Sequence, residues 1–138
     1  MGSSNEVNLQ YGHYAWENWQ AKQYATNGYY CIQNVQFGRY LSFNAAGCST
    51  FQGAGCGSVT SATSCGQNEQ FMVVQNANDA TKFGLRSVAN PHAFLRLDGS
   101  GITSELGSGG GVVNGQYYSN NQAPDNYELV QMKSTGNC

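Results

Sequence analysis

The fold is decided by a stretch that occurs twice, first as Arg39-Tyr40-Leu41-Ser42-Phe43-Asn44 and later as Ala93-Phe94-Leu95-Arg96-Leu97-Asp98. Leu41 and Phe43 in the first copy, and Leu95 and Leu97 around Arg96 in the second, alternate with polar neighbours, a period of two that is typical of a strand with one buried face. A related segment precedes each copy, and the two segments are Cys31-Ile32-Gln33-Asn34-Val35 and Gly84-Leu85-Arg86-Ser87-Val88. Turn-forming pairs such as Asn90-Pro91 and Asp98-Gly99 separate these runs. The sequence therefore predicts short strands joined by turns.

Another pattern occurs three times, as an acidic, a polar and an aromatic residue followed by mostly apolar ones. Its copies are Glu17-Asn18-Trp19-Gln20-Ala21, Glu69-Gln70-Phe71-Met72-Val73 and Asp125-Asn126-Tyr127-Glu128-Leu129. A short segment around a valine precedes each copy, and these valines are Val7, Val59 and Val113. Such ordered matches, at a near-constant spacing of about 52–56 residues, indicate an internal repeat.

The repeat predicts one all-β domain over residues 5–133 with a C-terminal tail at 134–138. A half repeat occupies 5–26, and whole repeats of about four strands each occupy 27–80 and 81–133. This division predicts about ten short strands. No helix-period stripe of useful length competes with this interpretation.

At these residues the chain resembles the fascin-like branch of the β-trefoils, the group that includes fascins and hisactophilins. The resemblance is carried by Gly38-Arg39-Tyr40-Leu41, by Ala93-Phe94-Leu95 and by the three second halves of the repeats. It implies a barrel of six strands capped by three hairpins, and it supplies no functional residues. Ricin-type lectins share this architecture but carry a Gln-x-Trp signature. The chain has Glu-x-Trp, Glu-x-Phe and Asp-x-Tyr there, so we expect it to lie outside that subfamily.

The absent first half of repeat one would leave unpaired strand edges, which invite another strand. Three explanations are open. In the first, the chain is a processed product that pairs with a missing precursor segment. In the second, another copy of the chain covers the gap in a homo-oligomer, and in the third, the N-terminal segment pairs differently and closes a smaller sheet.

Charge excludes several classes of partner. The chain has 138 residues, a net charge of −2 and only 10% charged residues. Its six basic residues are scattered, so no stripe suits a phosphate backbone, and nucleic acid is not an expected partner. No polybasic run suits anionic lipid, and no stretch approaches the ~20 apolar residues of a membrane helix, so no membrane insertion is expected.

Five cysteines in a short chain favour an oxidising compartment and hence secretion. The candidates for disulfides are Cys31, Cys48, Cys56 and Cys65, three of which share one Gly/Ser/Thr-rich stretch. Cys138 is left over, as a frayed terminal thiol or an intermolecular link. No C-x-x-C pair occurs and there are two histidines, so neither a metal site nor a cofactor is expected.

No catalytic residue is predicted. His13 and His92 lie in turn-like contexts without a nucleophile motif, and His92 is interpreted as a solvated turn residue. Glu17, Glu69 and Asp125 recur at symmetric positions, which favours a structural task such as bonding the backbone at the start of a strand. A catalytic pair needs two different pKa values and so breaks symmetry. The aromatic residues of the same pattern, Trp19, Phe71 and Tyr127, are predicted to lie in the core.

Candidate ligand-binding residues lie between the paired strands of each second half. The first copy offers Tyr14 and Trp16, and the last offers Tyr117, Tyr118 and Asn120. Aromatic faces stack on the C–H patches of sugars, and amide side chains bond their hydroxyl groups. Asn44 and Asp98, at equivalent positions of the two first halves, are predicted to add polar contacts.

The sequence thus favours a secreted, non-enzymatic, lectin-like module that binds neutral glycans. The first alternative is an extracellular matrix protein that assembles with other copies of itself, because the chain has an odd cysteine and a Gly/Ser/Tyr/Asn-rich composition. A fascin-like actin-binding protein is the weaker alternative, because the basic surface patches linked with actin bundling are not found.

Overall fold

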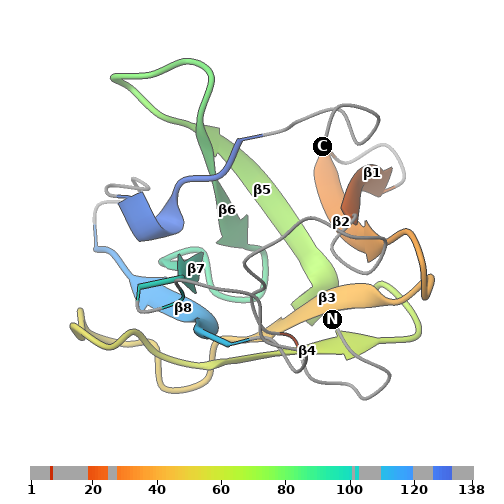
Figure 1. Ribbon diagram of the computed structural model, residues 1–138, viewed down its shortest axis with the longest axis horizontal. Helices are drawn as coiled ribbons and strands as arrows, with labels where there is room; N and C mark the ends of the chain where they lie inside the picture. The colour runs from red at the N-terminus through yellow and green to blue at the C-terminus, as the bar shows by residue number, and fades with distance from the viewer. Residues whose placement is uncertain are drawn as a thin grey trace.

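The computed structural model describes residues 7, 19–24, 28–100, 102, 110–119 and 126–131. Within these residues the chain is all-β, with eight strands in one sheet and two short 3-10 helices (Figure 1). The elements are β1 (Trp19–Tyr24), β2 (Tyr29–Asn34), β3 (Tyr40–Asn44), β4 (Ser58–Ala62), η2 (Gln67–Glu69), β5 (Gln70–Gln75), β6 (Phe83–Ser87), β7 (Ala93–Asp98), β8 (Val112–Tyr117) and η3 (Asn126–Glu128). The all-β, β-trefoil-like fold class is confirmed, and the first expected strand lies outside the described residues except for Val7.

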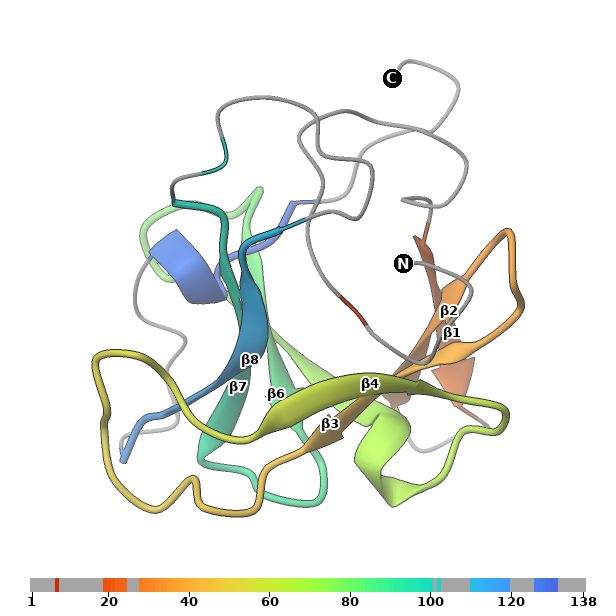
Figure 2. The same ribbon diagram turned by 60° about the horizontal axis from the view of Figure 1, so that its bottom comes forward.

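The sheet follows the order β4-β3-β2-β5-β6-β7-β8, and β1 pairs with β2 off this path. All pairs are antiparallel, and the hairpins β3–β4 and β7–β8 are each joined to the rest by a single residue pair. The remaining strands β1, β2, β5 and β6, which we call the barrel strands, carry the two hairpins, with β3 next to β2 and β7 next to β6 (Figure 2). The sheet is therefore a nearly closed barrel with hairpin arms.

The strand register reproduces the offset read from the sequence. Asn44 pairs with Ser58 in β3–β4, and Asp98 pairs with Val112 in β7–β8, so the second pair is the first pair moved by one repeat. The barrel strands follow a similar rule, because Trp19 pairs with Asn34 where the next copy pairs Phe71 with Ser87. The internal repeat is therefore a repeat of hydrogen-bonding pattern as well as of residue type.

The core is built from the alternating apolar residues. Leu41 and Phe43 of β3 are buried with Phe71 of β5, and Leu85 and Leu95 come from the second copy. Val59 is buried, while Val7 and Val113 pack against the cluster as partly buried residues. Burial at this alternation is the main term that selects the strand faces, at roughly 25 cal/mol per Å² of apolar surface.

The three recurring aromatic residues were predicted to lie in the core, and this is fully confirmed for one of them. Phe71 is fully buried, Trp19 is half-buried and packs against the core, and Tyr127 is 41% exposed. The expectation for Tyr127 is therefore wrong. Residues Asn126–Glu128 form η3 instead of a strand, and this turn buries Glu128 while Tyr127 lies over the guanidinium of Arg96.

Among the described residues, the structure has no helix with the length and hydropathy needed to cross a membrane.

Candidate functional site

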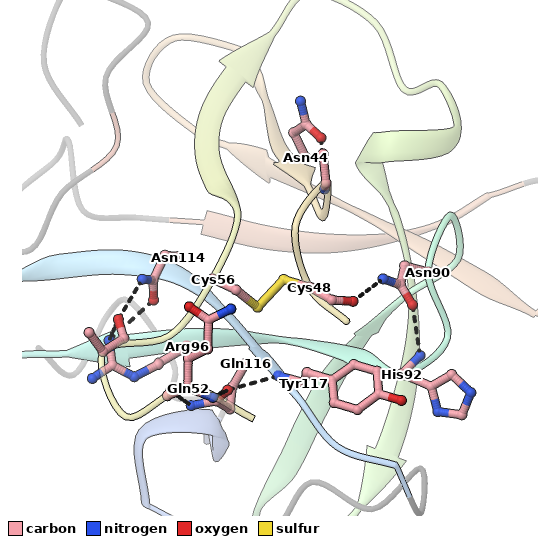
Figure 3. Close-up of a disulfide and its surroundings, with 12 residues drawn as sticks. Asn44, Cys48, Gln52, Cys56, Asn90, His92, Arg96, Asn114, Gln116 and Tyr117 are labelled. Carbon is pink, nitrogen blue, oxygen red and sulfur yellow. Dashed lines mark hydrogen bonds between the residues drawn. A yellow bond between two sulfur atoms is a disulfide. The ribbon is translucent and has the colours of Figure 1, made fainter. Parts of the chain in front are cut away.

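The connection between β3 and β4, residues 45–57, is long for a hairpin loop and is tied by a disulfide between Cys48 and Cys56 (Figure 3). A second disulfide joins Cys31 in β2 to Cys65 before η2. The four cysteines singled out in the sequence are thus paired in two loops of different size, with sequence separations of 8 and 34.

The loop lies along β8 of the other repeat (Figure 2). Cys56 and Gly115 exchange two backbone hydrogen bonds, each 2.7 Å. Upstream, the backbone N–H of Gln52 donates to Oε1 of Gln116 at 3.1 Å, and Nε2 of Gln116 donates back to the carbonyl of Gln52. One arm of the loop is therefore bonded to β8 like a short additional strand.

Arg96 fastens the same arm from β7. Its Nη1 donates to the carbonyl of Ala54 and to Oδ1 of Asn114, both at 3.2 Å, and its Nη2 forms an ion pair with Asp98 at 2.8 Å. The side chain is 5% exposed, and its guanidinium carbon lies 5.2 Å from the ring centre of Tyr127. A buried guanidinium with paired donors and an aromatic face beside it is well placed to fix a loop.

The docked loop and the end of β8 line an open pocket of about 340 Å³. The lining residues come from two segments, and they are Ser49, Thr50, Phe51, Tyr117, Tyr118 and Ser119. The rings of Phe51 and Tyr118 have their centres 5.6 Å apart and are tilted by 59°. Phe51 is 59% exposed, so its ring remains available to a bound molecule.

Contacts behind the pocket hold the tyrosines. The hydroxyl of Tyr118 donates to Oε2 of the buried Glu128 at 3.1 Å, and its ring lies 6.1 Å from that of Phe94. The Tyr118 backbone N–H donates to the carbonyl of His92 at 2.8 Å, and Nδ1 of His92 lies 3.3 Å from the Tyr118 carbonyl oxygen. The interpretation of His92 as a solvated turn residue is incomplete, because its ring also packs 5.5 Å from that of Tyr117.

Of the ligand-binding residues proposed from sequence, the structure brings Tyr117 and Tyr118 together at the pocket. Tyr14, Trp16 and Asn120 lie outside the described residues, as does Cys138.

Asp98 is not at this pocket. Its pairing with Val112 places it at the opposite end of the β7–β8 hairpin from Tyr117, which pairs with Ala93. Its Oδ1 accepts hydrogen bonds from the hydroxyl and the backbone N–H of Ser100, and these bonds, with Arg96, hold the pKa of Asp98 below its usual value.

Asn44 does the equivalent task one repeat earlier. Its Oδ1 accepts a hydrogen bond from the backbone N–H of Ala46 at 3.0 Å, and its side chain points away from the Cys48–Cys56 disulfide in Figure 3. Both residues therefore shape turns after a strand, which is the ordinary use of Asn and Asp at such positions.

The residues that sequence reasoning missed are Phe51 and its neighbours Ser49 and Thr50. Phe51 is an aromatic residue between two cysteines in a Gly-rich stretch, outside any expected strand, and this position was a signal of a candidate binding residue. Its contact with Tyr118 joins two different repeats, and no local pattern could reveal such a contact.

Glu69 performs the structural task predicted for the recurring acidic residue. Its Oε1 accepts from the backbone N–H of Gly66 at 2.9 Å, and its Oε2 is hydrogen-bonded to the hydroxyl of Ser42. Its counterparts Glu17 and Asp125 lie outside the described residues. Within the described ranges, no cluster of three or more His, Cys, Asp or Glu side chains could hold a metal ion.

Comparison with known proteins assigns the chain to a family. Residues 15–106 match the family described as ricin-type β-trefoil lectin domain-like, and no curated protein matches the chain. Among solved structures, the chain is similar to one titled "BEL beta-trefoil apo crystal form 3". The identity is 17% and the TM-score 0.51, over 78% of this chain and 73% of that chain, a likeness that shows the fold alone.

The family match corrects the expectation that the chain lies outside the ricin-type group, and it does not confirm a fascin-like assignment. The expectation rested on the absent Gln-x-Trp signature. In the middle copy of the pattern, Phe71 fills the aromatic position in the core and Glu69 bonds the neighbouring turn without that signature. The chain belongs to the ricin-type β-trefoil lectin domain-like family.

Proposed function

We propose that this protein is a non-enzymatic, lectin-like module that binds a neutral saccharide in the pocket between the Cys48–Cys56 loop and the end of β8. The observation that carries the proposal is the pair of tilted rings, Phe51 and Tyr118, flanked by the hydroxyl groups of Ser49, Thr50 and Ser119. Ligand pockets combine apolar walls with a few placed polar groups, and this pocket has both.

The composition of the pocket favours a neutral sugar. None of its six described lining residues carries a charge, so a carboxylate or sulfate group would lose water without gaining a counter-charge. A pyranose ring can place its C–H face on one aromatic wall and its edge against the other. The three hydroxyl side chains both donate and accept, which suits sugar hydroxyl groups of either orientation.

The pocket is organised before a ligand enters. The hydrogen bond from Tyr118 to Glu128 fixes the phenol ring, and the paired bonds between Gln52 and Gln116 fix the loop next to Phe51. Groups that are already ordered lose less conformational entropy on binding, which raises affinity for a given set of contacts.

An extracellular location is part of the proposal, supported by the two disulfides. A single shallow pocket gives modest affinity, so association with a second copy would strengthen binding to a glycan-covered surface through effective concentration.

The test is binding of the oxidised protein to an immobilised panel of neutral glycans, with free-sugar competition. Phe51→Ala and Tyr118→Ala should each weaken binding about tenfold or more, equivalent to about 1.4 kcal/mol. Tyr24→Ala is the matched control, because Tyr24 is an exposed tyrosine of β1 that does not line the pocket. Tyr118→Phe separates the role of the ring from that of the hydroxyl group.

A panel on which the folded protein binds nothing would contradict the proposal. The first alternative, the self-assembling matrix protein, would then be favoured, and sedimentation of the oxidised protein over a range of concentrations would test it.

A further inference from the structure

The pocket wall that carries Phe51 is a short segment held at two ends. Ser49, Thr50 and Phe51 lie between Cys48, which is tied to Cys56, and Gln52, which is bonded to Gln116 of β8. Phe51 is 59% exposed, so burial contributes little to its position. The geometry of the wall therefore depends on its two attachments.

The two attachments differ in kind. Gln52 belongs to the arm that carries the bonds to Gln116 and Gly115 and the contact of Ala54 with Arg96, so this arm has several anchors. At the other end, the carbonyl of Cys48 accepts one hydrogen bond from Nδ2 of Asn90 at 3.1 Å, as Figure 3 shows. The remaining anchors of Cys48 are a local backbone bond to Ala45 and the disulfide.

We infer that the Cys48–Cys56 disulfide is a positioning element of the saccharide site, so that binding affinity depends on it, whereas Cys31–Cys65 serves the stability of the fold alone. This inference rests on the proposed function. With the disulfide open, the Cys48 end of the wall keeps the side-chain bond from Asn90 and the local backbone bond to Ala45. Phe51 then gains freedom that a ligand must remove on binding.

The second disulfide is a natural control. Cys31 lies in β2 and Cys65 precedes η2, where its sulfur contacts the carbonyl of Glu69 at 3.5 Å. Neither of these cysteines lines the pocket. Opening this bond should loosen the barrel without changing the relation between Phe51 and Tyr118.

Both cysteines of the loop are buried, with Cys48 5% exposed and Cys56 7% exposed. A reductant has poor access to them, and attack on a disulfide requires access. Burial of both cysteines therefore limits reduction of this disulfide in the folded protein.

The experiment compares Cys48→Ser/Cys56→Ser with Cys31→Ser/Cys65→Ser. Titration calorimetry with the methyl glycosides of galactose, glucose, mannose and N-acetylglucosamine measures affinity per folded molecule. The nuclear Overhauser effect between the rings of Phe51 and Tyr118, together with amide exchange of residues 49–52, reports the wall without any sugar. Cys48→Ala/Cys56→Val, which keeps the buried sites apolar, replaces the serine variant if that variant does not fold.

We expect the loop variant to bind about tenfold more weakly, with the ring–ring effect lost and amide exchange faster. The control variant should keep its affinity within about twofold while melting at a lower temperature. Unchanged affinity and an unchanged ring–ring effect in the loop variant would overturn the inference, and so would an equal loss of affinity in the control. If the wild-type chain binds no glycoside, the proposed function fails, and the ring–ring effect and exchange decide the positioning role by themselves.

Discussion

Gly115 shows at the residue scale how closely the loop approaches the barrel. A Cβ at this position would lie 2.1 Å from Cζ of Phe43 and 3.1 Å from the carbonyl oxygen of Cys56. Phe43 is fully buried within the core cluster, so its ring must repack against neighbouring core residues to make room. The absence of a side chain at Gly115 is therefore what lets the loop pair with β8 above the core.

Gly115→Ala should destabilise the fold by about 1–3 kcal/mol, the usual cost of overpacking a filled core. Gly53→Ala is the control, because nothing lies within 4 Å of a Cβ built there. Thermal or urea unfolding of both variants measures the effect. Equal stability of the two would show that the close approach of Phe43 is not rigid.

Asp98 makes stability depend on pH at the acid end. Hydrogen bonds from Ser100, and then the charge of Arg96, lower its pKa from the ordinary value of 3.8. A carboxyl group with a lowered pKa in the folded state stabilises that state above its unfolded pKa, and the contribution is lost as pH falls through the folded value.

Asp98→Asn should therefore lower the melting temperature at pH 6–7, and the difference from the wild type should shrink below about pH 4. Melting curves between pH 2 and pH 7 measure it. The pKa of Asp79 is also lowered, by hydrogen bonds from Thr81, so Asp79 should make both proteins less stable in acid in the same direction. A difference that stays constant over the whole range would contradict the assignment.

At the scale of elements, the described residues of the two whole repeats share three strands, and the fourth element is β5 in one and η3 in the other. The β3–β4 and β7–β8 hairpins have equivalent registers, yet the disulfide-closed loop belongs to β3–β4. Where Tyr117 and Tyr118 end one hairpin, the equivalent positions of the other hairpin hold Thr63 and Ser64. Each described repeat therefore contributes a different half of one pocket.

Loop length predicts how the two disulfides differ in stability. Closing rings with separations of 34 and 8 residues removes chain entropy worth about 4 and about 2.5 kcal/mol respectively. Cys31→Ser/Cys65→Ser should therefore lower the free energy of unfolding more than Cys48→Ser/Cys56→Ser. Urea titration of both variants compares them. The reverse order would mean that the docked loop contributes more to the fold than its ring size implies.

For the whole molecule, the proposed function links binding to stability. A saccharide that binds only the folded state, at about 100 times its dissociation constant, stabilises it by about 2.7 kcal/mol. The melting temperature of the wild type should rise by several degrees. Tyr118→Ala, which weakens binding about tenfold, should reduce the stabilisation to about 1.4 kcal/mol and so roughly halve the rise. Differential scanning calorimetry with and without the sugar measures both. An equal rise in Tyr118→Ala would place the ligand elsewhere.

Sequence alone determined the repeat, the buried face of β3 and the cysteines that pair, whereas β7 buries Phe94, Leu95 and Arg96 in succession instead of alternating. These features are local or periodic: Leu41 and Phe43 alternate with polar residues, and the valine and acidic–aromatic segments recur at near-constant offsets. Such patterns report which side of a strand is buried, because burial repeats with the period of the pleat.

Tertiary structure decided the candidate site. Tyr118 could be named from sequence as a candidate binding aromatic, but its partner Phe51 lies in the other repeat and reaches it through the docked loop. Tyr127 was misplaced because η3 turned Glu128 inward instead. A pocket between repeats depends on contacts between residues far apart in the chain. Residue patterns carry information only about neighbouring residues and about periods. The sequence therefore determined the strands and the repeat, and the tertiary structure determined which residues meet at the pocket.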